Sequence, residues 1–516
     1  MHNRDTRAAW NYHNETKHSA ASVRSNRHFL DFENYPLPFK VYPALAPLPL
    51  PREGQPSGLA ALSVIADPGA PPRGDAVPDL ATLAQILYFS AGVTRTKKFP
   101  GGEIFFRAAS CTGALYETEL YVVCGDLPGL PAGVYHFGAG DFALRLLRAG
   151  DFRGALVRAT AGESAIQRAP LILVSTGTYW RNAWKYQART YRHFGWDNGT
   201  LHANLLAMCA AHRLPARVVS GFVDDDVNRL LDLDTQREVA LTLVPIGHVA
   251  AEPPAPPEIS PLHLETVSPS KKEVDYPSMR EMHSASSLAS DEEVVSWRGG
   301  LPSRPPREPR AEKIFPLEPC SDAEIFRDTI EQVILRRGSS RKFAREAISF
   351  REFSTVLERS TRGIPADFLP APEELLNDLH VIVHAVEGLA PGAYFFDRAR
   401  GALVCLKEGN FRDEAYYLGL AQDLPADAAA AIFYLADLRA ILQRFGNRGY
   451  RAVQLEAGIL GGKLYLAAYA QRLGATGLTF YDDDVTEFFS PHAANKSAIF
   501  LMAIGKGGTR PLVMPK

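Results

Sequence analysis

Residues 191–201 read YRHFGWDNGTL, and residues 450–460, which follow 259 positions later, read YRAVQLEAGIL. Four more pairs of segments keep this order and spacing to within one residue. They are PAGVYHF (131–137) with APGAYFF (390–396), AGDFR (149–153) with EGNFR (408–412), FVDDDV (222–227) with FYDDDV (480–485), and LTLVPIG (241–247) with FLMAIG (500–505). Solenoid repeats recur every ~20–50 residues, so this longer period predicts two fused copies of one domain.

The duplication also sets the expected domain boundaries. A chain of 516 residues would by itself suggest about three or four domains, but two copies reduce this to two. We predict a first domain over 10–250 and a second over 312–516. Residues 251–311 are rich in Pro, Ser and charge, so we expect a flexible linker. It is long enough to let the copies face each other as an intramolecular pseudo-dimer.

Each copy has an α+β pattern, with helices around a sheet. ELYVVCG (119–125) and LHVIVHAVEG (379–388) are short β-rich runs that end at glycine and turn residues. LHANLLAMCAAHRL (201–214) and LGGKLYLAAYAQRL (460–473) have apolar residues at helical spacing with few polar interruptions. These two segments are predicted to form buried central helices.

Charge and cysteine usage exclude several classes of protein. The net charge of −2 gives no electrostatic reason to expect a nucleic acid or an anionic membrane as a partner, and no run approaches the ~18 apolar residues of a membrane span. Five cysteines without a CxxC pair suit a reducing cytoplasm and argue against a disulfide framework or a structural zinc. We predict no metal site, because Asp224–Asp226 and Asp482–Asp484 each precede a helix-like run, where N-terminal capping and complementarity to the helix dipole are expected.

A basic segment in the second copy has the chemistry of an anion site. Residues 336–343 read RRGSSRKF, and the last strand of this copy ends in IGKGGTR (504–510). Guanidinium groups and hydroxyl donors on a tight turn suit a phosphate group, and cations after the last strand could complete the site. The candidate ligands are Arg337, Ser339, Arg341, Lys506 and Arg510. The alternative is a solvated basic turn.

These motifs resemble a known flavoprotein superfamily. RGSSRKF (337–343) with the basic tail is similar to the arginine-serine-arginine motif that holds the FMN phosphate in the nitroreductase-like fold. The first copy resembles a branch of that superfamily, the SagB/ThcOx dehydrogenases, in YHNETKHS (12–19), RAASCTGALYETE (107–119) and WKYQARTYRHFGWDNG (184–199). The resemblance implies two tandem domains, each with a mainly antiparallel sheet and surrounding helices, and an FMN cofactor at their interface.

The two copies depart from the family in complementary ways. The first copy has no arginine-serine-arginine motif. Where the family has a serine that contacts the flavin and a Gly-His pair, this copy has Cys111 and Gly199-Thr200. The second copy lacks the Gly-Ala-Leu-Tyr segment and the Lys-Tyr pair. The resemblance therefore implies one composite FMN site, with the phosphate ligands named above from the second copy. The flavin ring side would be formed by Arg107, Cys111, Gly113, Ala114 and Leu115 of the first copy and by Phe480 and Tyr481 of the second.

Lys185 and Tyr186 are the candidate catalytic residues. Oxidation of a C–N or C–C single bond by a flavin requires hydride departure and a base for the remaining proton, and burial with a neighbouring cation can lower the pKa of a lysine and a tyrosine toward neutrality. The alternative is a packing helix with Trp180, Trp184 and Tyr191 as its buried stripe and Lys185 in solvent.

The expected function is that of an FMN-dependent dehydrogenase in a natural-product-type pathway. The family chemistry it resembles is azoline-to-azole oxidation of a small, peptide or carrier-bound substrate, alongside other pathway enzymes. Two alternatives stay open: a nitro- or quinone-type reductase that uses NAD(P)H, and a non-catalytic scaffold subunit of a peptide-modifying complex.

Overall fold

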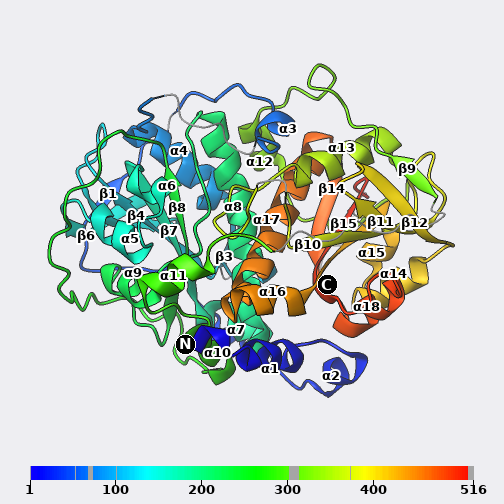
Figure 1. The fold of residues 1–516 in the computed structure, drawn as a ribbon, viewed down its shortest axis with the longest axis horizontal. Helices are drawn as coiled ribbons and strands as arrows, with labels where there is room; N and C mark the ends of the chain where they lie inside the picture. Colours follow the sequence, from blue (N-terminus) through cyan, green and yellow to red (C-terminus); the bar gives the residue numbers. More distant parts are fainter. Residues whose placement is uncertain are drawn as a thin grey trace.

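The computed structural model describes residues 2–52, 54–67, 74–99, 102–301, 313–371 and 374–508. Each copy contains one antiparallel sheet (Figure 1). The first sheet has the order β1 (Pro47–Pro49), β6 (Ala143–Ala149), β5 (Gly133–Gly138), β4 (Thr118–Cys124), β7 (Leu171–Thr178) and β8 (Glu238–Ile246). The second has the order β14 (Gly474–Leu478), β15 (Ser497–Gly505), β13 (Ala430–Ala436), β10 (Asn377–Val383), β11 (Gly392–Asp397), β12 (Ala402–Glu408) and β9 (Ile314–Pro316). The predicted pair of antiparallel α+β domains is confirmed.

Two long helices join the copies at the centre of the molecule. They are α8 (Thr190–Ala211) and α17 (Arg448–Ala470), which lie side by side between the sheets (Figure 1). A Cβ atom on Gly199 would come within 2.5 Å of the Gly458 backbone, so only glycine permits this approach. Both helices are apolar around most of their circumference because each is covered by its own sheet and by its partner helix.

Smaller helices pack around this framework, some against the two central helices and others against the sheets. In the first copy they are α1 (Arg7–Glu15), α2 (Ala20–Ser25), α3 (Ala61–Val64), α4 (Leu80–Ala91), α5 (Arg153–Ala159), α6 (Ser164–Gln167), α7 (Tyr179–Tyr186) and α9 (Asp224–Leu230). In the second they are α12 (Ile330–Arg336), α13 (Phe350–Thr361), α14 (Arg412–Leu418), α15 (Asp423–Asp427), α16 (Leu438–Phe445) and α18 (Asp482–Phe489). A separate two-stranded ribbon, β2 (Val93–Phe99) with β3 (Gly102–Arg107), leads into the candidate flavin loop.

The segment expected to be a flexible linker is in part folded. Within 251–311 it contains α10 (Pro277–Ala285) and α11 (Asp291–Trp297). Trp297 is fully buried, and its ring lies 5.5 Å from that of Phe445 in the second copy. Composition averaged over the whole segment hid these few apolar anchors, which supply the buried surface that orders the helices.

These two helices repeat the opening of the chain. The backbone of His18, after α1, exchanges hydrogen bonds with Asp482: the Asp482 N–H donates to His18 O at 3.1 Å, and the His18 N–H donates to the carboxylate at 2.8 Å. Leu288, after α10, makes the same two bonds with Asp224, at 3.2 and 2.9 Å. The helical arm of the second copy therefore lies inside the segment predicted to be a linker.

The acidic triplets lie in the first turns of α9 and α18, as complementarity to the helix dipole predicts, but they do not cap these helices. The N-cap residues of α9 and α18 are Val223 and Tyr481, and neither makes a side-chain cap bond. Asp224 and Asp482 instead lie in the first turn, fully buried, and bind arginines of the opposite copy. Interface charge pairing has replaced local capping.

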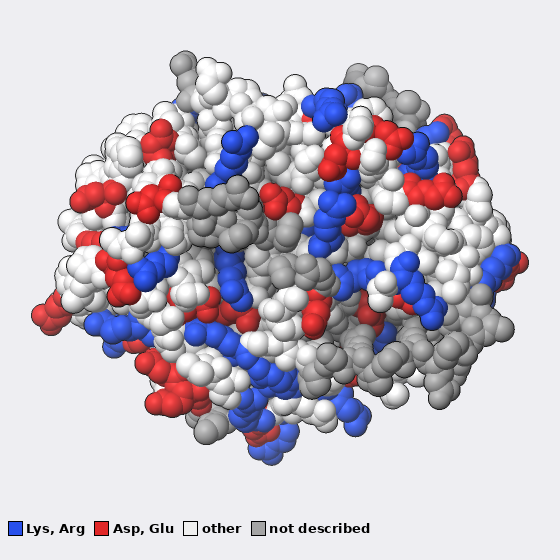
Figure 2. Space-filling view, turned by 45° about the horizontal axis from the view of Figure 1, so that its top comes forward, with Lys and Arg blue, Asp and Glu red and all other residues white. Residues whose placement is uncertain are grey.

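The surface carries both signs of charge. Lys and Arg are interspersed with Asp and Glu on the face displayed in Figure 2, which agrees with the small net charge. Among the described residues, no helix combines the length and the apolar character that crossing a bilayer requires.

Candidate active site between the two copies

The structure brings together the two basic segments of the second copy. Phe343 forms a β-bridge with Gly507. The Ala344 N–H donates to Lys506 O at 3.0 Å, and the Gly508 N–H donates to Lys342 O at 3.1 Å. Lys506 is thereby held beside the segment that carries Ser339 and Arg341, while Arg510 lies outside the described residues.

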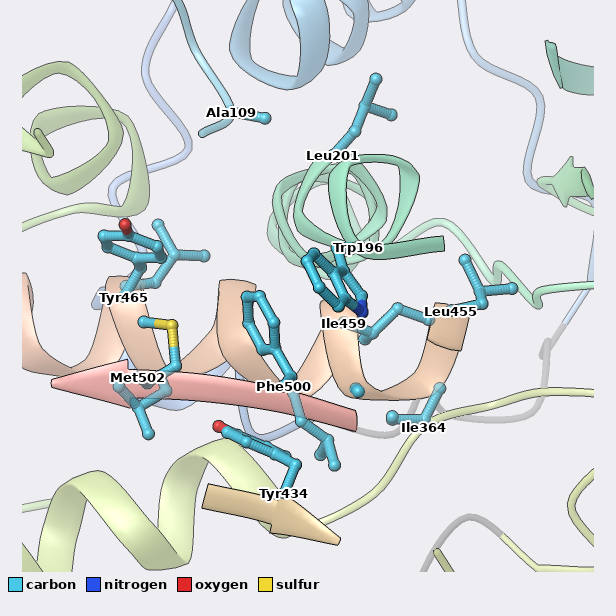
Figure 3. Packing of buried hydrophobic residues seen from close by; sticks show 14 of the residues in the cluster. Ala109, Trp196, Leu201, Ile364, Tyr434, Leu455, Ile459, Tyr465, Phe500 and Met502 are labelled. Atoms are coloured by element: carbon cyan, nitrogen blue, oxygen red, sulfur yellow. The ribbon is translucent and has the colours of Figure 1, made fainter. Parts of the chain in front are cut away.

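Arg337 crosses from this segment to the first copy. It caps α12, and its guanidinium donates to the carbonyl of Ala108 from Nε at 3.1 Å and from Nη2 at 2.9 Å. The same group lies 5.5 Å from the ring centre of Tyr465 on α17. Figure 3 shows the Tyr465 hydroxyl directed to the side on which Ala109 lies. The predicted phosphate arm of one copy therefore contacts the predicted ring loop of the other.

Tyr465 connects the basic segment to the end of the second sheet. Its hydroxyl lies 3.1 Å from Ser339 Oγ and accepts a hydrogen bond of 2.7 Å from the Gly477 N–H. Two residues farther on, the Thr479 hydroxyl oxygen is buried without a hydrogen-bond partner among the described residues. A buried hydroxyl without a partner is costly, so Thr479 offers a free donor and acceptor at the edge of the site. Neither Tyr465 nor Thr479 belongs to a sequence motif that singled it out.

The loop of the first copy is tightly fixed by Asp197 on α8. Its carboxylate accepts hydrogen bonds of 2.9 Å from the N–H and from the hydroxyl of Thr112. Gly113 and Ala114 both have positive φ angles, of 67° and 55°, a conformation that is strained for alanine. This anchoring presents the backbone of residues 113–115 toward Tyr186: a Cβ atom on Gly113 would lie 3.0 Å from the Tyr186 hydroxyl.

Two side chains of this loop do not face the expected cofactor space. Arg107 is buried and donates to the carbonyls of Pro38 at 2.6 Å and Thr118 at 3.3 Å, so only its backbone faces Arg337. Cys111 lies 3.3 Å from a carboxylate oxygen of Glu117. Burial, followed by the negative Asp197 and Glu117, raises the pKa of Cys111 well above its ordinary value. Cys111 is therefore a neutral thiol in a buried acidic cluster.

That cluster retains at least one proton. The ligand-type atoms of Cys111, Glu117 and Asp197 lie within 4.8 Å of one another. Burial, and then the Glu117 carboxyl group, raises the pKa of Asp197 well above its usual range. Two carboxyl groups in contact cannot both ionise at low cost, so the raised pKa favours the protonated form of Asp197.

The candidate catalytic residues end helix α7. Lys185 reaches the surface, with its amine 5.3 Å from the centre of the Tyr186 ring. Burial, and then the positive Arg341 of the second copy, lowers the pKa of Lys185. The expectation for Tyr186 is wrong: burial, and then Asp197, raises the pKa of its hydroxyl, although Arg341 acts in the opposite direction. Burial therefore favours the protonated form of the Tyr186 hydroxyl, whereas the pKa of Lys185 is shifted downward, toward that of a base.

Gln187 follows this pair in a conformation that side chains rarely adopt. Its φ and ψ are 52° and −142°, a region occupied almost only by glycine. Gly446, 259 positions later, ends α16 in nearly the same conformation, with φ 67° and ψ −159°. The first copy therefore keeps a strained residue directly beside Lys185 and Tyr186 where its duplicate has glycine.

Phe480 and Tyr481 contribute less than expected. The Tyr481 N–H already donates to the carbonyl of Leu418 at 2.9 Å. The Phe480 ring is fully buried, 6.2 Å from that of Trp196. The Asp482 N–H is also engaged, because it donates to the carbonyl of His18 at 3.1 Å, whereas the Thr479 hydroxyl has no partner among the described residues.

The second site that the duplication would produce, with the roles of the two copies exchanged, has different residues at the corresponding positions. Leu206 occupies the position 259 residues before Tyr465 and has no hydroxyl. Glu456 takes the place of Asp197 and accepts hydrogen bonds from the N–H groups of Leu376 and Asn377 at 2.7 and 2.8 Å. The carboxylate thus holds a direct lead into β10, where the first copy has the loop with Gly113.

Comparison with known proteins gives the family. The model of the "Nitroreductase family" matches residues 76–248 and again residues 334–506. The chain belongs to the nitroreductase family. Its two nitroreductase domains correspond to the two antiparallel sheets, and members of this family are oxidoreductases that are typically flavin-dependent.

Two relatives illustrate the match. A "putative nitroreductase" of Methanocaldococcus jannaschii is 25% identical over 186 residues, which cover 34% of this chain and 90% of that protein. A crystal structure of a "putative nitroreductase" from Anabaena variabilis is 24% identical, with a TM-score of 0.76 over 97% of this chain and 99% of that one. The second likeness shows that the tandem arrangement of nitroreductase domains occurs in another protein.

The residues of this nitroreductase site fit a flavin mononucleotide. Arg337, Ser339, Arg341 and Lys506 would supply cationic and hydroxyl donors for a phosphate. The Thr479 hydroxyl, which has no hydrogen-bond partner among the described residues, would be free for a polar contact with the cofactor.

Proposed function

We propose that this nitroreductase-family protein is an FMN-dependent dehydrogenase with one composite site per chain. Arg337, Ser339, Arg341 and Lys506 of the second copy would hold the phosphate. The loop over 111–115 of the first copy would lie against the ring. The observation that carries this proposal is the hydrogen bond from Arg337 to the Ala108 carbonyl. It connects the basic segment of the second copy to the loop of the first copy.

The reaction we propose is oxidation of a C–N or C–C single bond, of the azoline-to-azole type. FMN, when bound, accepts the hydride equivalent from the substrate. Lys185 takes the proton from the adjacent substrate atom, because burial and Arg341 favour its neutral amine. Tyr186 keeps its proton and donates a hydrogen bond that orients the substrate. The resemblance of residues 107–119 and 184–199 to the SagB/ThcOx dehydrogenases supports this chemistry.

A second candidate is an NAD(P)H-dependent nitro- or quinone-type reductase, which family membership favours. In that reaction the substrate proton is not abstracted, so Lys185 would have no role as a base. We place either enzyme in the cytoplasm, because all five cysteines are free thiols. A small, peptide or carrier-bound substrate and associated pathway enzymes are the proposed partners.

The absorbance spectrum of the purified protein and anaerobic flavin reduction test these alternatives. The dehydrogenase predicts a yellow protein whose flavin is reduced by a thiazoline- or oxazoline-containing peptide without NAD(P)H. Reduction by NAD(P)H alone, with rapid turnover of quinones, would support the reductase. A colourless protein that takes up no FMN would leave the scaffold role.

A further inference from the structure

A cavity lies in the first copy, between the start of α7, the turn that precedes β8 and residues 264–273 of the segment that joins the copies. Its volume is about 310 Å³, at the lower end of the ~300–1,000 Å³ that small-molecule sites occupy. None of the candidate FMN ligands or catalytic residues that the structure describes lines this cavity. It is therefore distinct from the candidate active site.

The buried part of the lining carries two cations. Arg181 is 3% exposed, and its Nη1 donates to the carbonyl of Tyr116 and to the carboxylate of Glu119, both at 2.6 Å. Within the described residues, Nε and Nη2 of Arg181 make no hydrogen bond. The second cation is Lys40, whose amine donates to Glu238 at 2.6 Å. Unused donors on a buried guanidinium are costly, so this part of the lining favours an anionic group.

The more exposed part of the lining is acidic. Asp232 accepts hydrogen bonds from two backbone N–H groups, at 2.9 and 3.0 Å, and Asp234 accepts one at 3.1 Å. Arg237 and Glu273, which also line the cavity, pair with each other at 3.2 Å. Neither Asp232 nor Asp234 has an ion-pair partner in the part of the chain that the structure describes. Their uncompensated charge favours a cationic group at the more exposed side.

Aromatic side chains supply the apolar part of the lining. The indole N–H of Trp180 donates to Ser270 Oγ at 2.7 Å. The hydroxyl of the buried Tyr42 lies 3.2 Å from that of Tyr121. These bonds hold both rings in place, so the surface that an apolar ligand body would contact is preorganised.

We propose that this cavity binds a small zwitterion with an apolar body, of the amino-acid type. The carboxylate of the ligand meets Arg181, and its ammonium group meets Asp232 and Asp234. The apolar body packs against the aromatic rings. A simple anion or a simple cation would leave one of the two charged regions uncompensated, whereas a zwitterion satisfies both. This ligand is not the substrate of the proposed dehydrogenase reaction.

Isothermal titration calorimetry of the full chain tests the charge requirement. The probes are L-phenylalanine, 3-phenylpropionate, which lacks the ammonium group, and phenethylamine, which lacks the carboxylate. We expect a single site for L-phenylalanine and at least ~10-fold weaker binding of each analogue, as for the loss of a charge-assisted hydrogen bond. Asp234→Asn should weaken the binding of L-phenylalanine but not that of 3-phenylpropionate.

Two matched variants test the location of the site. Val267→Trp places a large side chain at a residue that lines the cavity and should abolish measurable binding of L-phenylalanine. Val274→Trp, at a valine of the same segment outside the lining, should bind the probe like the wild type. The two valines are 43% and 41% exposed, so both variants should fold. The absorbance of bound flavin should not change when L-phenylalanine is added.

Other outcomes overturn the proposal. Absence of binding by all three probes removes the cavity as a site of this class. Equal binding of 3-phenylpropionate assigns a plain anion site, and equal binding of phenethylamine assigns a plain cation site. Wild-type binding by Val267→Trp, or a flavin spectrum that changes with L-phenylalanine, places the ligand elsewhere. The proposed dehydrogenase function is tested separately, by flavin reduction with an azoline peptide, so the two proposals fail independently.

Discussion

The carboxylate of Asp224 in the first copy lies 2.6 Å from the guanidinium of Arg448 in the second. Asp224 also binds Arg451 at 2.8 Å. Asp482, the corresponding residue of the second copy, binds Arg192 at 2.5 Å and Arg189 at 3.2 Å. Both aspartates, Arg448, Arg192 and Arg189 are buried, and Arg451 is nearly so, with 9% of its side chain exposed, so each charge depends on its partners for compensation.

Loss of either carboxylate should destabilise the interface. Asp224→Asn leaves Arg448 and Arg451 buried without a counter-charge, and we expect a loss of ~3–5 kcal/mol in the free energy of unfolding. Asp482→Asn is the matched variant and should lose a similar amount. Urea denaturation followed by tryptophan fluorescence measures both. A loss below ~1 kcal/mol in either variant would contradict the interface role, and Asp226→Asn, at the surface, serves as the control.

The same pairs should make the protein sensitive to acid. Burial raises the pKa of Asp224, but Arg448 and Arg451 outweigh burial and lower it from 3.8 to about 2. The native state therefore binds fewer protons than the unfolded state in this range, and the stabilisation is lost as the pH falls from about 4 to about 2. Melting temperatures measured across this window should fall steeply in the wild type and more gradually in Asp224→Asn.

Flavin binding should depend on the second copy. Arg337→Ala removes a charge-assisted bond to the phosphate and should release FMN with little change in far-ultraviolet circular dichroism. We expect a ratio of one FMN per chain in the wild type. Arg95→Ala, at an arginine of the first copy that lies 4.8 Å from the Phe106 ring, should retain the flavin. A reproducible ratio of two would show that the opposite half-site is also competent.

Catalysis should depend on Lys185 and Tyr186 without affecting the bound cofactor. Lys185→Ala should stay yellow, while substrate-dependent flavin reduction falls by ~10²–10⁴-fold, as for loss of a positioned general base. Because the pKa of Lys185 is lowered, the wild-type rate should rise with pH to a plateau below the ordinary lysine pKa. Tyr186→Phe should slow the reaction but keep this pH profile, since the tyrosine stays protonated. Stopped-flow absorbance measures the rate of flavin reduction in both variants. Unchanged rates would support the alternative in which α7 is only a packing helix.

Melting temperatures of variants at Gln187 and at Gly446, its counterpart in the second copy, should reveal the backbone strain at Gln187. Gln187→Gly relieves a conformation that costs ~1–3 kcal/mol and should raise the melting temperature, despite the larger entropy of the unfolded glycine chain. Gly446→Ala should have the opposite effect, because its φ is positive and the new Cβ would lie 2.2 Å from the carbonyl of Asn3. If Gln187→Gly also slows flavin reduction, the strain contributes to the placement of Lys185.

The sequence by itself determined the duplication, the central helices and the two basic segments. The repeats at 191–201 and 450–460 preserve the residues that both copies need for their shared core, so the two-domain fold could be predicted. Arg337, Lys506 and Lys185 stay predictions as site residues; the short motifs pointed to them because guanidinium, ammonium and neighbouring hydroxyl groups have recognisable chemistry.

Only the tertiary structure decided which of these groups meet and in what protonation state. Cys111 and Arg107 turn inward because Glu117, Pro38 and Thr118 offer them partners that are distant in the sequence. The helices α10 and α11 could not be predicted within the expected linker, because a few buried apolar side chains such as Trp297 are enough to order them. Burial and charges from other segments raise the pKa of Tyr186 and lower that of Lys185. These effects come from residues that are distant in the sequence, so no local motif could predict them.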